Sequence, residues 1–308
     1  MRIALINSGL GLLAAAAALH RMRPDADLVL ATDPDGMPWG PRTPDDIADR
    51  ALLCARAAVE YEPDVLVMAC NTGSVHALEP MRAEFEPDIP VIGTVPAIKP
   101  AAATHRLVAI WATVATTSSA YQRRLIAEFG GSALVTPVAC PGLADAVDAG
   151  DEAATDAAVT AAAAQTPAGC EAIVLGCTEY ELAADRIRAA VPGAVTFASA
   201  NAVAAQALRR IPASGARSRL DSSRLDNSRL DNSRLDNSRL DNSRLDNSRL
   251  DSAQLDSGPL GTVRVLLSGR PAPLPPAALR YPEGRLLAPL VRLGDRGHEP
   301  AADPAITR

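Results

Sequence analysis

The stretch VLVMACNT at Val65–Thr72 occurs again as AIVLGCTE at Ala172–Glu179, so the chain holds two near copies of one pattern. Each copy begins with an unbroken apolar run, which is typical of a strand buried on both faces of a parallel sheet. A small residue, a cysteine and two polar residues follow. This order predicts that each cysteine lies where a buried strand gives way to a helix, in two related halves of the molecule.

Short apolar runs alternate with alanine-rich stretches along residues 1–211, and this alternation predicts an α/β fold. We expect two pseudo-symmetric parallel-sheet domains with the active site in the cleft between them. The expected strands are Arg2–Ile6, Ala26–Ala31, Val65–Ala69, Pro90–Gly93, Leu107–Trp111, Ser132–Val138, Ala172–Leu175, Ala194–Phe197 and Thr262–Gly269. The expected helices are Leu10–Met22, Thr43–Tyr61, Gly73–Phe85, Ser118–Phe129, Asp151–Ala164, Tyr180–Val191 and Ala200–Ile211.

Composition shifts divide the chain further. We expect a first domain at residues 1–95, completed by about 200–213 and 260–270, and a second domain at 96–199. A low-complexity insertion occupies 214–259, and a Pro-rich tail, expected to be loose, occupies 271–308. The insertion contains eight tandem five-residue units of the SRLDN type. Their polar, Pro-free composition favours a flexible linker, and a short β-solenoid with leucine at every fifth residue is the alternative.

Charge and composition exclude several classes of function. A net charge of −6 argues against a nucleic-acid surface, and no apolar run is long enough to span a membrane. The N-terminus begins directly with a strand pattern instead of a signal peptide. Five cysteines without a CxxC pair indicate reduced thiols and a cytoplasmic protein. Four scattered histidines and a single lysine, Lys99, favour neither a metal site nor a pyridoxal cofactor, so we expect no cofactor and no metal.

Cys70 and Cys177 are the leading candidates for chemistry, because ligands bind at the carboxyl ends of strands in open α/β sheets. If the two halves face each other, both thiols face one cleft. A helix beginning at each cysteine would lower the pKa of its thiol. A lone cysteine beside a buried strand is more often a small hydrophobic core residue without a chemical role. We favour this interpretation for Cys54, Cys140 and Cys170.

Two opposed thiols suit the inversion of a carbon stereocentre, because one can remove the α-proton while the other delivers a proton to the opposite face. Such a site must also hold the carboxylate and ammonium of an amino acid. Polar residues at strand ends could supply the hydrogen bonds, although each could equally be an ordinary helix cap. These residues are Ser8, Asn71, Thr72, Thr113, Thr116 and Thr178.

Several motifs, in order, resemble those of the aspartate/glutamate racemase superfamily. They are NSGLG at Asn7–Gly11, PWG at Pro38–Gly40, ACNT at Ala69–Thr72 and GCTEY at Gly176–Tyr180. Further stretches are similar to the glutamate racemase branch: Val95–Pro100, Ala112–Thr116 with Ala120–Gln122, Cys140–Leu143 and the strand Val263–Gly269. The resemblance covers about residues 2–211 and 260–270.

The resemblance implies a cofactor-independent racemase in which Cys70 and Cys177 are the paired acid and base. Residues that match its motifs would line the substrate, and they are Ser8, Trp39, Gly40, Asn71, Thr72 and Thr178. It also implies an isomerase whose partner is a small amino acid, neither nucleic acid nor membrane, and it allows a homodimer.

Four positions depart from the glutamate racemase pattern. Asn7 stands where that branch has Asp, Glu179 where it has His, Asp148 where Glu is common, and Leu12 where it has Gly. Asn7 cannot act as a base but can orient a group by hydrogen bonds, so both Asn7 and Glu179 remain expected substrate-site residues. The anion at Glu179 should raise the pKa of the neighbouring thiol and oppose a carboxylate on the substrate side chain.

Three hypotheses follow. The first is a glutamate racemase that supplies D-glutamate for peptidoglycan. The second, suggested by Glu179, is a racemase for aspartate or another small amino acid. The third is a binding paralogue with weak turnover or none. Proton exchange at the substrate α-carbon in deuterated water separates the enzymes from the binding protein.

Overall fold

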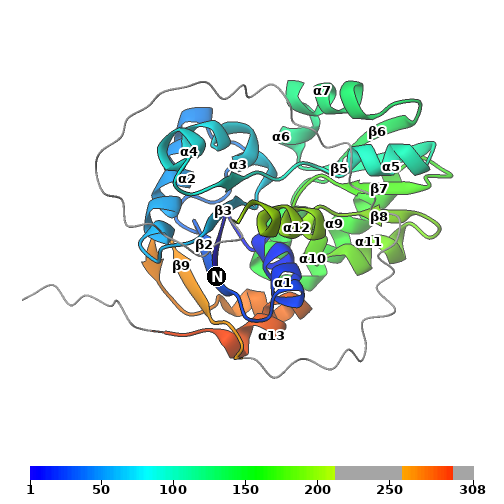
Figure 1. Ribbon diagram of the computed structural model, residues 1–308. Helices are drawn as coiled ribbons and strands as arrows, with labels where there is room; N and C mark the ends of the chain where they lie inside the picture. Colours follow the sequence, from blue (N-terminus) through cyan, green and yellow to red (C-terminus); the bar gives the residue numbers. More distant parts are fainter. Residues whose placement is uncertain (212–258, 294–308) are drawn as a thin grey trace, which may run out of the picture.

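Two separate sheets form the framework of the molecule in the computed structural model, which describes residues 1–211 and 259–293 (Figure 1). The first sheet has the strand order β10-β9-β2-β1-β3-β4, and the second has the order β6-β5-β7-β8. Every strand pair is parallel except β9 with β10, so the expected α/β class is confirmed. The strands are β1 (Arg2–Asn7), β2 (Asp27–Thr32), β3 (Val65–Met68), β4 (Val91–Ile92), β5 (Leu107–Ala112), β6 (Leu134–Ala139), β7 (Ala172–Leu175), β8 (Val195–Phe197), β9 (Val263–Leu267) and β10 (Arg270–Pro271).

Helices cover both faces of each sheet. They are α1 (Leu12–Met22), α2 (Pro44–Val59), α3 (Asn71–His76), α4 (Leu78–Phe85), α5 (Ile98–Thr104), α6 (Val114–Thr117), α7 (Ala120–Phe129), α8 (Leu143–Ala149), α9 (Glu152–Gln165), α10 (Glu179–Leu182), α11 (Ala184–Ala190), α12 (Ala200–Arg210), the 3-10 helices η2 (Pro276–Arg280) and η3 (Ala288–Leu290), and α13 (Pro282–Leu287). Two expected helices are each divided in two, at Ala77 and Ala183. At the first break, Pro80 has no N–H to donate to the carbonyl of His76. The short helices α5, α6 and α8 were not expected.

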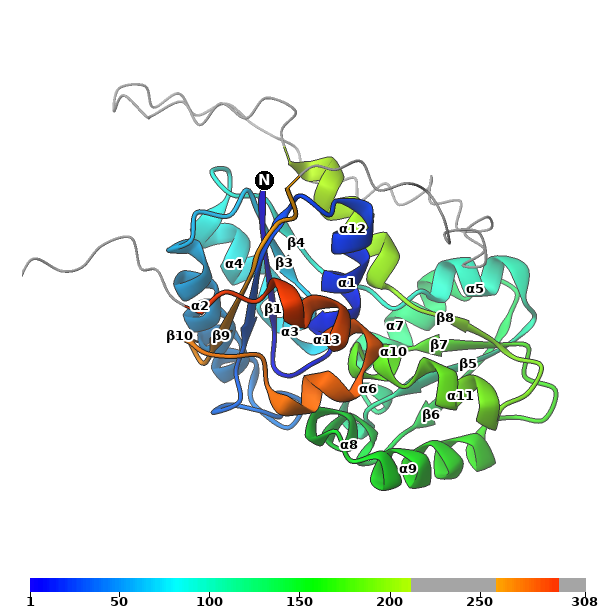
Figure 2. The ribbon, with the colours of Figure 1, turned by 90° about the horizontal axis from the view of Figure 1, so that it is seen from below.

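The alternation of side chains along β1 shows how the first sheet is packed. Ile3 and Leu5 lie in the core with α1, whereas Ala4 and Ile6 lie in a second cluster with α2. The core on the α1 side continues without a break into the second sheet, where it includes Trp111 of β5. Helices α1 and α12 therefore lie between the two sheets and join them (Figures 1 and 2).

The segment after β10 corrects one expectation. We expected residues from 271 onward to be loose, but η2, α13 and η3 pack against α1 and α8 as far as the structure describes them. Ala278, Leu287 and Leu290 are buried in the main core. Tyr281 donates a hydrogen bond from its hydroxyl to the carbonyl of Val147, at 2.6 Å. The proline count misled the sequence interpretation, because three of these prolines stand in first turns, where proline is tolerated.

Strand β9 lies next to β2 in the first sheet, although residues 211–262 separate it from α12 in sequence. The chain can pass close to the backbone at Ala26 before β9 because residue 261 is a glycine. A Cβ at this position would lie 2.0 Å from the carbonyl oxygen of Ala26. The domain boundaries that we set at residues 95 and 199 stay a prediction, and the SRLDN repeat lies outside the described residues. Within residues 1–211 and 259–293, no helix is long and apolar enough to cross a membrane.

Candidate active site

Four strand ends carry the polar residues expected in the site. Strands β1 and β3 end next to Asn7 and Cys70 in the first sheet, and β5 and β7 end next to Thr113 and Cys177 in the second. Two hydrogen bonds cross between the halves at this place. Asn71 donates from Nδ2 to the carbonyl of Gly176 at 2.8 Å, and Asn7 donates from Nδ2 to Oγ1 of Thr178 at 3.1 Å. The duplicated strand ends therefore face each other.

Cys70 is 6% exposed and stands at the beginning of α3. Its backbone is still extended, with φ −139° and ψ 128°, so the thiol acts as the cap of the helix. The N–H of Gly73 donates to Sγ at 3.4 Å. The backbone amides of Ser8 and Thr72 also face this sulfur. Cys70 thus lies among backbone donors from the first turn of α3 and from Ser8, which follows β1.

Cys177 has a different neighbour. Its Sγ donates a hydrogen bond to Oε2 of Glu179 at 2.9 Å, and the same oxygen accepts from Oγ1 of Thr178 at 3.2 Å. Glu179 is buried, at 4% exposure, and its Oε1 has no hydrogen-bond partner. A carboxylate therefore lies in direct contact with the second thiol.

The acidity of the thiols differs from our expectation. We expected helix N-termini to lower both pKa values, but burial raises the pKa of Cys70 to about 12, and the charge of Glu179 adds to this effect. Burial and Glu179 raise the pKa of Cys177 well above its usual range, and the neighbouring Cys70 contributes in the same direction. The expectation of lowered pKa values was wrong, because α3 and α10 are short and desolvation of the thiolate outweighs them. The expected effect of Glu179 on its neighbour agrees with the structure.

A second carboxylate, on Asp148, lies close to the site and was not among the residues we proposed for it. Oδ1 of Asp148 accepts a hydrogen bond from the backbone N–H of Leu10 at 2.6 Å. A Cβ on Gly9 would lie 2.3 Å from the same oxygen, so the glycine leaves room for the carboxylate. Burial and the charge of Glu179 raise the pKa of Asp148 well above its ordinary value. The sequence marked Asp148 only as a departure from the glutamate racemase pattern, and that departure was the signal that could have led to its place in the site.

Trp39 and Gly40 lie in the loop between β2 and α2. The indole of Trp39 is 1% exposed, donates from Nε1 to Oδ2 of Asp33 at 2.9 Å, and belongs to the α2-side core of the first sheet. A Cβ on Gly40 would lie 3.8 Å from that of Ala115 in α6, so the loop approaches the second half. The structure places the indole in the core, and Gly40 at the boundary between the halves.

The remaining hydroxyl groups are held by local bonds. Ser8 donates to Oδ1 of Asn7 at 3.2 Å. Thr113 donates to Oγ1 of Thr116 at 3.0 Å and accepts the backbone N–H of Thr116 at 3.3 Å, so it caps α6. Thr72 is half-buried next to Cys70. Among the amide groups, Oδ1 of Asn71 is buried without a partner and could accept a hydrogen bond from a ligand.

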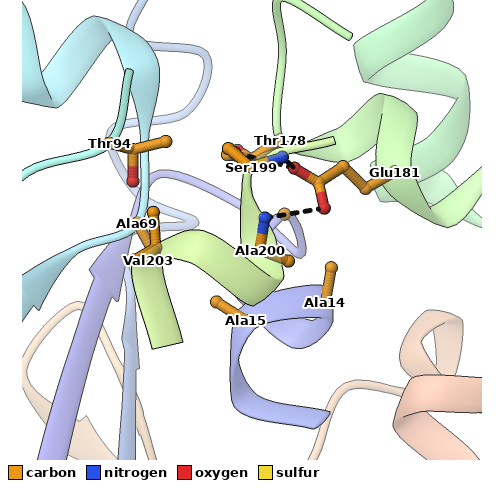
Figure 3. Close-up of a pocket in the computed structure, with 10 residues that line it drawn as sticks. Ala14, Ala15, Ala69, Thr94, Thr178, Glu181, Ser199, Ala200 and Val203 are labelled. Carbon is orange, nitrogen blue, oxygen red and sulfur yellow. Dashed lines mark hydrogen bonds between the residues drawn. The ribbon is translucent and has the colours of Figure 1, made fainter. Parts of the chain in front are cut away.

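A small pocket lies on the α1 and α12 side of Thr178 (Figure 3). Glu181 lies at its wall and accepts hydrogen bonds from the backbone N–H groups of Ser199 and Ala200, at 2.8 and 3.2 Å. This carboxylate therefore caps the N-terminus of α12 and forms part of the pocket wall. In the described part of the chain, no three His, Cys, Asp or Glu side chains gather where they could hold a metal ion.

Comparisons with known proteins match this geometry. The family model described as Asp/Glu/Hydantoin racemase matches residues 7–208. A glutamate racemase of Pseudomonas putida (strain W619) is 32% identical over 217 residues, which cover 69% of this chain and 82% of the relative. A glutamate racemase of Herpetosiphon aurantiacus is 33% identical over 218 residues, which cover 69% and 85%.

Solved structures agree. The glutamate racemase of Escherichia coli, in complex with L-glutamate and the activator UDP-MurNAc-Ala, matches with a TM-score of 0.64 at 26% identity, over 68% of this chain and 82% of that one. The glutamate racemase of Aquifex pyrophilus matches with a TM-score of 0.54 at 31% identity, over 69% and 84%. The family match spans both cysteine copies and the strand ends that carry them, and this chain belongs to the Asp/Glu/Hydantoin racemase family.

Proposed function

We propose that this chain interconverts L- and D-glutamate, with Cys70 and Cys177 as the two acid/base groups and without an added cofactor. The observation that carries the proposal is the meeting of two duplicated strand ends, each with a cysteine, at one place between the sheets. The relatives and solved structures above, which are named glutamate racemases, support glutamate as the substrate. D-glutamate for peptidoglycan is then the product that the cell uses.

In this mechanism one thiolate removes the α-proton of the amino acid, and the electron pair of the C–H bond stays on the α-carbon. The opposite thiol delivers its proton to the other face of that carbon, which inverts the centre. In the reverse direction the thiols exchange roles. Because a thiolate is the active base, and burial raises the pKa of both thiols, the thiolate form becomes more populated as the pH rises.

Polar groups around the thiols would hold the amino acid in place. We propose that the substrate contacts Ser8, Asn71, Thr72, Thr113, Thr116 and Thr178, along with the backbone at Gly40 and the loop held by Trp39. The partnerless Oδ1 of Asn71 suits an ammonium donor. Asn7 and Glu179 complete the proposed site from the ends of β1 and β7.

A second candidate substrate is aspartate or another small amino acid. The observation that favours it is Glu179, whose carboxylate lies where it would repel a carboxylate on a longer substrate side chain. We also propose that the protein works in the cytoplasm, which the five free cysteines of the structure support. A homodimer is part of the same proposal, and light scattering on the purified protein tests it.

Proton NMR in deuterated buffer tests the function. We expect the α-proton signal of L-glutamate to disappear with the unmodified protein and to persist with Cys70→Ala and with Cys177→Ala. Cys54→Ala is the matched control, since Cys54 is buried in α2 and its thiol faces the carbonyl of Thr32 in β2. Exchange with aspartate alone would replace glutamate by the second candidate. No exchange with either would indicate a binding paralogue.

A further inference from the structure

The loop between β2 and α2 is tied to a segment from much later in the sequence. Ser268 directly follows β9, which pairs in parallel with β2 (Figure 1). Its backbone N–H donates to the carbonyl of Thr32 at 2.7 Å, and its hydroxyl accepts the backbone N–H of Asp35 at 3.1 Å. The same hydroxyl donates to Oδ1 of Asp33 at 3.1 Å. Ser268 thus holds the start of this loop through both its backbone and its side chain.

The backbone of Ser268 has a conformation that serine seldom adopts. Its φ is 46°, in the left-handed region, and Glu62 is the other non-glycine residue with a positive φ in the described part of the chain. Glycine enters this region without steric cost, whereas a side chain adds strain. Such strain persists where the surrounding structure compensates for it. At Ser268 the hydrogen bonds of the hydroxyl supply this compensation, and glycine could not make them.

Asp33 lies at the centre of these contacts. It is 1% exposed, so its carboxylate depends on hydrogen bonds from the protein. Oδ1 accepts from Ser268, and Oδ2 accepts from Nε1 of Trp39 at 2.9 Å and from Nη1 of Arg50 in α2 at 3.2 Å. A Cβ on Gly36 would lie 2.0 Å from Oδ2, so the loop closes tightly around the carboxylate. The orientation of the indole therefore depends on a carboxylate that Ser268 holds from its other oxygen.

The indole of Trp39 connects this arrangement to the first thiol. A Cβ on Gly73 would lie 3.0 Å from Cζ3 of Trp39, so the ring packs against the first turn of α3. The N–H of Gly73 is the group that donates to Sγ of Cys70 at 3.4 Å. Gly40, the next residue of the loop, approaches Ala115 across the boundary between the halves. A displacement of Trp39 would therefore disturb both the turn at Cys70 and the backbone at Gly40.

We propose that Ser268 is a positioning residue of the active site. Through Asp33 and Trp39, its hydroxyl holds the loop at Gly40 in the conformation that binds the amino acid. The strand that follows the SRLDN repeat in the sequence thereby contributes to the site. The effect on turnover rests on the proposed racemisation, whereas the effect on the loop does not.

Hydrogen exchange of the indole N–H groups tests the contact without any amino acid. The chain has two tryptophans, and each indole is hydrogen bonded: Trp39 to Asp33, and Trp111 to Oγ1 of Thr166 at 2.9 Å. Their NMR signals are assigned with Trp39→Phe. We expect the Trp39 N–H to exchange about tenfold faster in Ser268→Gly, the factor that corresponds to one hydrogen bond to a charged group. The Trp111 N–H, as the internal control, should exchange at an unchanged rate.

Glycine is the informative substitution, because it removes the hydroxyl and also relieves the strain at φ 46°. Ser268→Ala removes the hydroxyl and keeps the strain. It should accelerate Trp39 exchange equally, while it unfolds at a lower urea concentration than Ser268→Gly. Ser268→Asn, which tolerates a positive φ and can donate to Asp33, should restore slow exchange.

Glu62→Gly is the matched control. It relieves a positive φ of 51° shortly before β3, at the amino end of the parallel strands, whereas Ser268 follows the carboxyl end of β9. We expect both indole N–H groups to exchange in this variant as they do in the unmodified chain.

Racemisation kinetics separate positioning from a purely structural role. We expect Ser268→Gly to raise the KM for glutamate by about threefold or more and to change kcat less, since binding must then order a looser loop. Ser268→Asn should restore the KM. A purely structural defect would instead lower the amount of active protein, and so the apparent kcat, at an unchanged KM.

An unchanged rate of Trp39 exchange in folded Ser268→Gly protein would overturn the inference, and so would a fall in kcat at an unchanged KM. If the unmodified chain racemises no amino acid, the proposed function fails. The indole exchange then still decides whether Ser268 holds the loop, because it is measured without substrate.

Discussion

The ends of β3 and β7 carry the same cysteine in almost the same sequence, and yet the two thiols differ in what surrounds them. The first is followed by Asn71 and Thr72, and its sulfur meets backbone N–H groups. The second is followed by Thr178 and Glu179, and its sulfur meets a buried carboxylate. The comparison teaches that duplicated strands place the thiols symmetrically, whereas one acidic side chain is enough to make their chemistry unequal.

Removal of either thiol is the strongest test of this comparison. We expect Cys70→Ala and Cys177→Ala each to lower racemisation by about 10³-fold, within the range of a lost general acid or base. Turnover in both directions should fall, because each direction needs both groups. Racemase assays with L- and D-glutamate, with circular dichroism as the control for folding, measure the effect. If either variant kept its activity, the thiol that it lacks would not be required for racemisation.

The next largest effect is expected at Gly11. A Cβ there would lie 2.4 Å from Oγ1 of Thr178 and 2.7 Å from both Nδ2 of Asn7 and Oε1 of Glu179. Gly11→Ala must therefore displace the side chains that hold Glu179 beside Cys177, and a displacement of this size can lower kcat by about 100-fold. We expect Cys177 alkylation to rise in the same variant. Normal kcat in a folded Gly11→Ala protein would show that the hydrogen bonds from Asn7 to Thr178 and from Thr178 to Glu179 are not needed for turnover.

The pH dependence of the reaction sharpens the comparison further. Since burial raises the pKa of Cys70 to about 12, its thiolate fraction grows as pH rises through neutrality. We expect kcat/KM to increase by up to about tenfold per pH unit between pH 6 and 8. In Glu179→Gln this rise should move to lower pH, because the anion that raises both thiol pKa values is gone. A flat profile would mean that a thiolate is not the base.

Asp148 allows a test of stability. Its pKa is raised in the folded protein by burial and by Glu179, so its contribution favours folding below its ordinary pKa and is lost as pH rises through the raised value. At pH 7 the buried carboxylate is therefore unfavourable. We expect Asp148→Asn to increase the free energy of unfolding at pH 7 by about 1 kcal/mol, and to lose this advantage at pH 3 to 4. Urea unfolding at both pH values measures it.

The smallest expected effect concerns the contact between the C-terminal helices and the second half. Tyr281→Phe removes the hydrogen bond to the carbonyl of Val147 and should cost about 1 kcal/mol of unfolding free energy. Activity should stay within about twofold, since the hydroxyl bonds a backbone carbonyl and not a side chain of the proposed site. A larger loss of activity than of stability would mean that this contact orients Asp148, the next residue.

Much of this structure follows from local pattern. The nine expected strands are all present, because buried parallel strands are continuous apolar runs whose ends are marked by polar residues. Helices α5, α6 and α8 were missed because they have only four to seven residues, too few for an apolar repeat to be visible. The C-terminal helices were missed because a cluster of prolines usually indicates a loop. Here each of three prolines stands in the first turn of a short helix, which the proline count alone does not reveal.

At the site, the residue types could be predicted but their electrostatics could not. Cys70 and Cys177 were evident from the duplication, and Glu179 was evident as an anion beside a thiol. The direction of the thiol pKa values depends on burial by both halves at once, which no local stretch encodes. Asp148 approaches Leu10 across 138 residues of sequence, so only the folded chain shows that two carboxylates share the site.

The late position of β9 in the sequence has a consequence for synthesis. Until residues 263–267 leave the ribosome, β2 presents an open edge, although β1, β3 and all the catalytic candidates have already been made. An open strand edge is a template for pairing with other chains. A nascent chain in which both Cys70 and Cys177 have been synthesised can therefore still aggregate through the open edge of β2. Pairing of β9 with β2 closes this edge, and it requires a glycine at position 261, where a Cβ would clash with the backbone at Ala26.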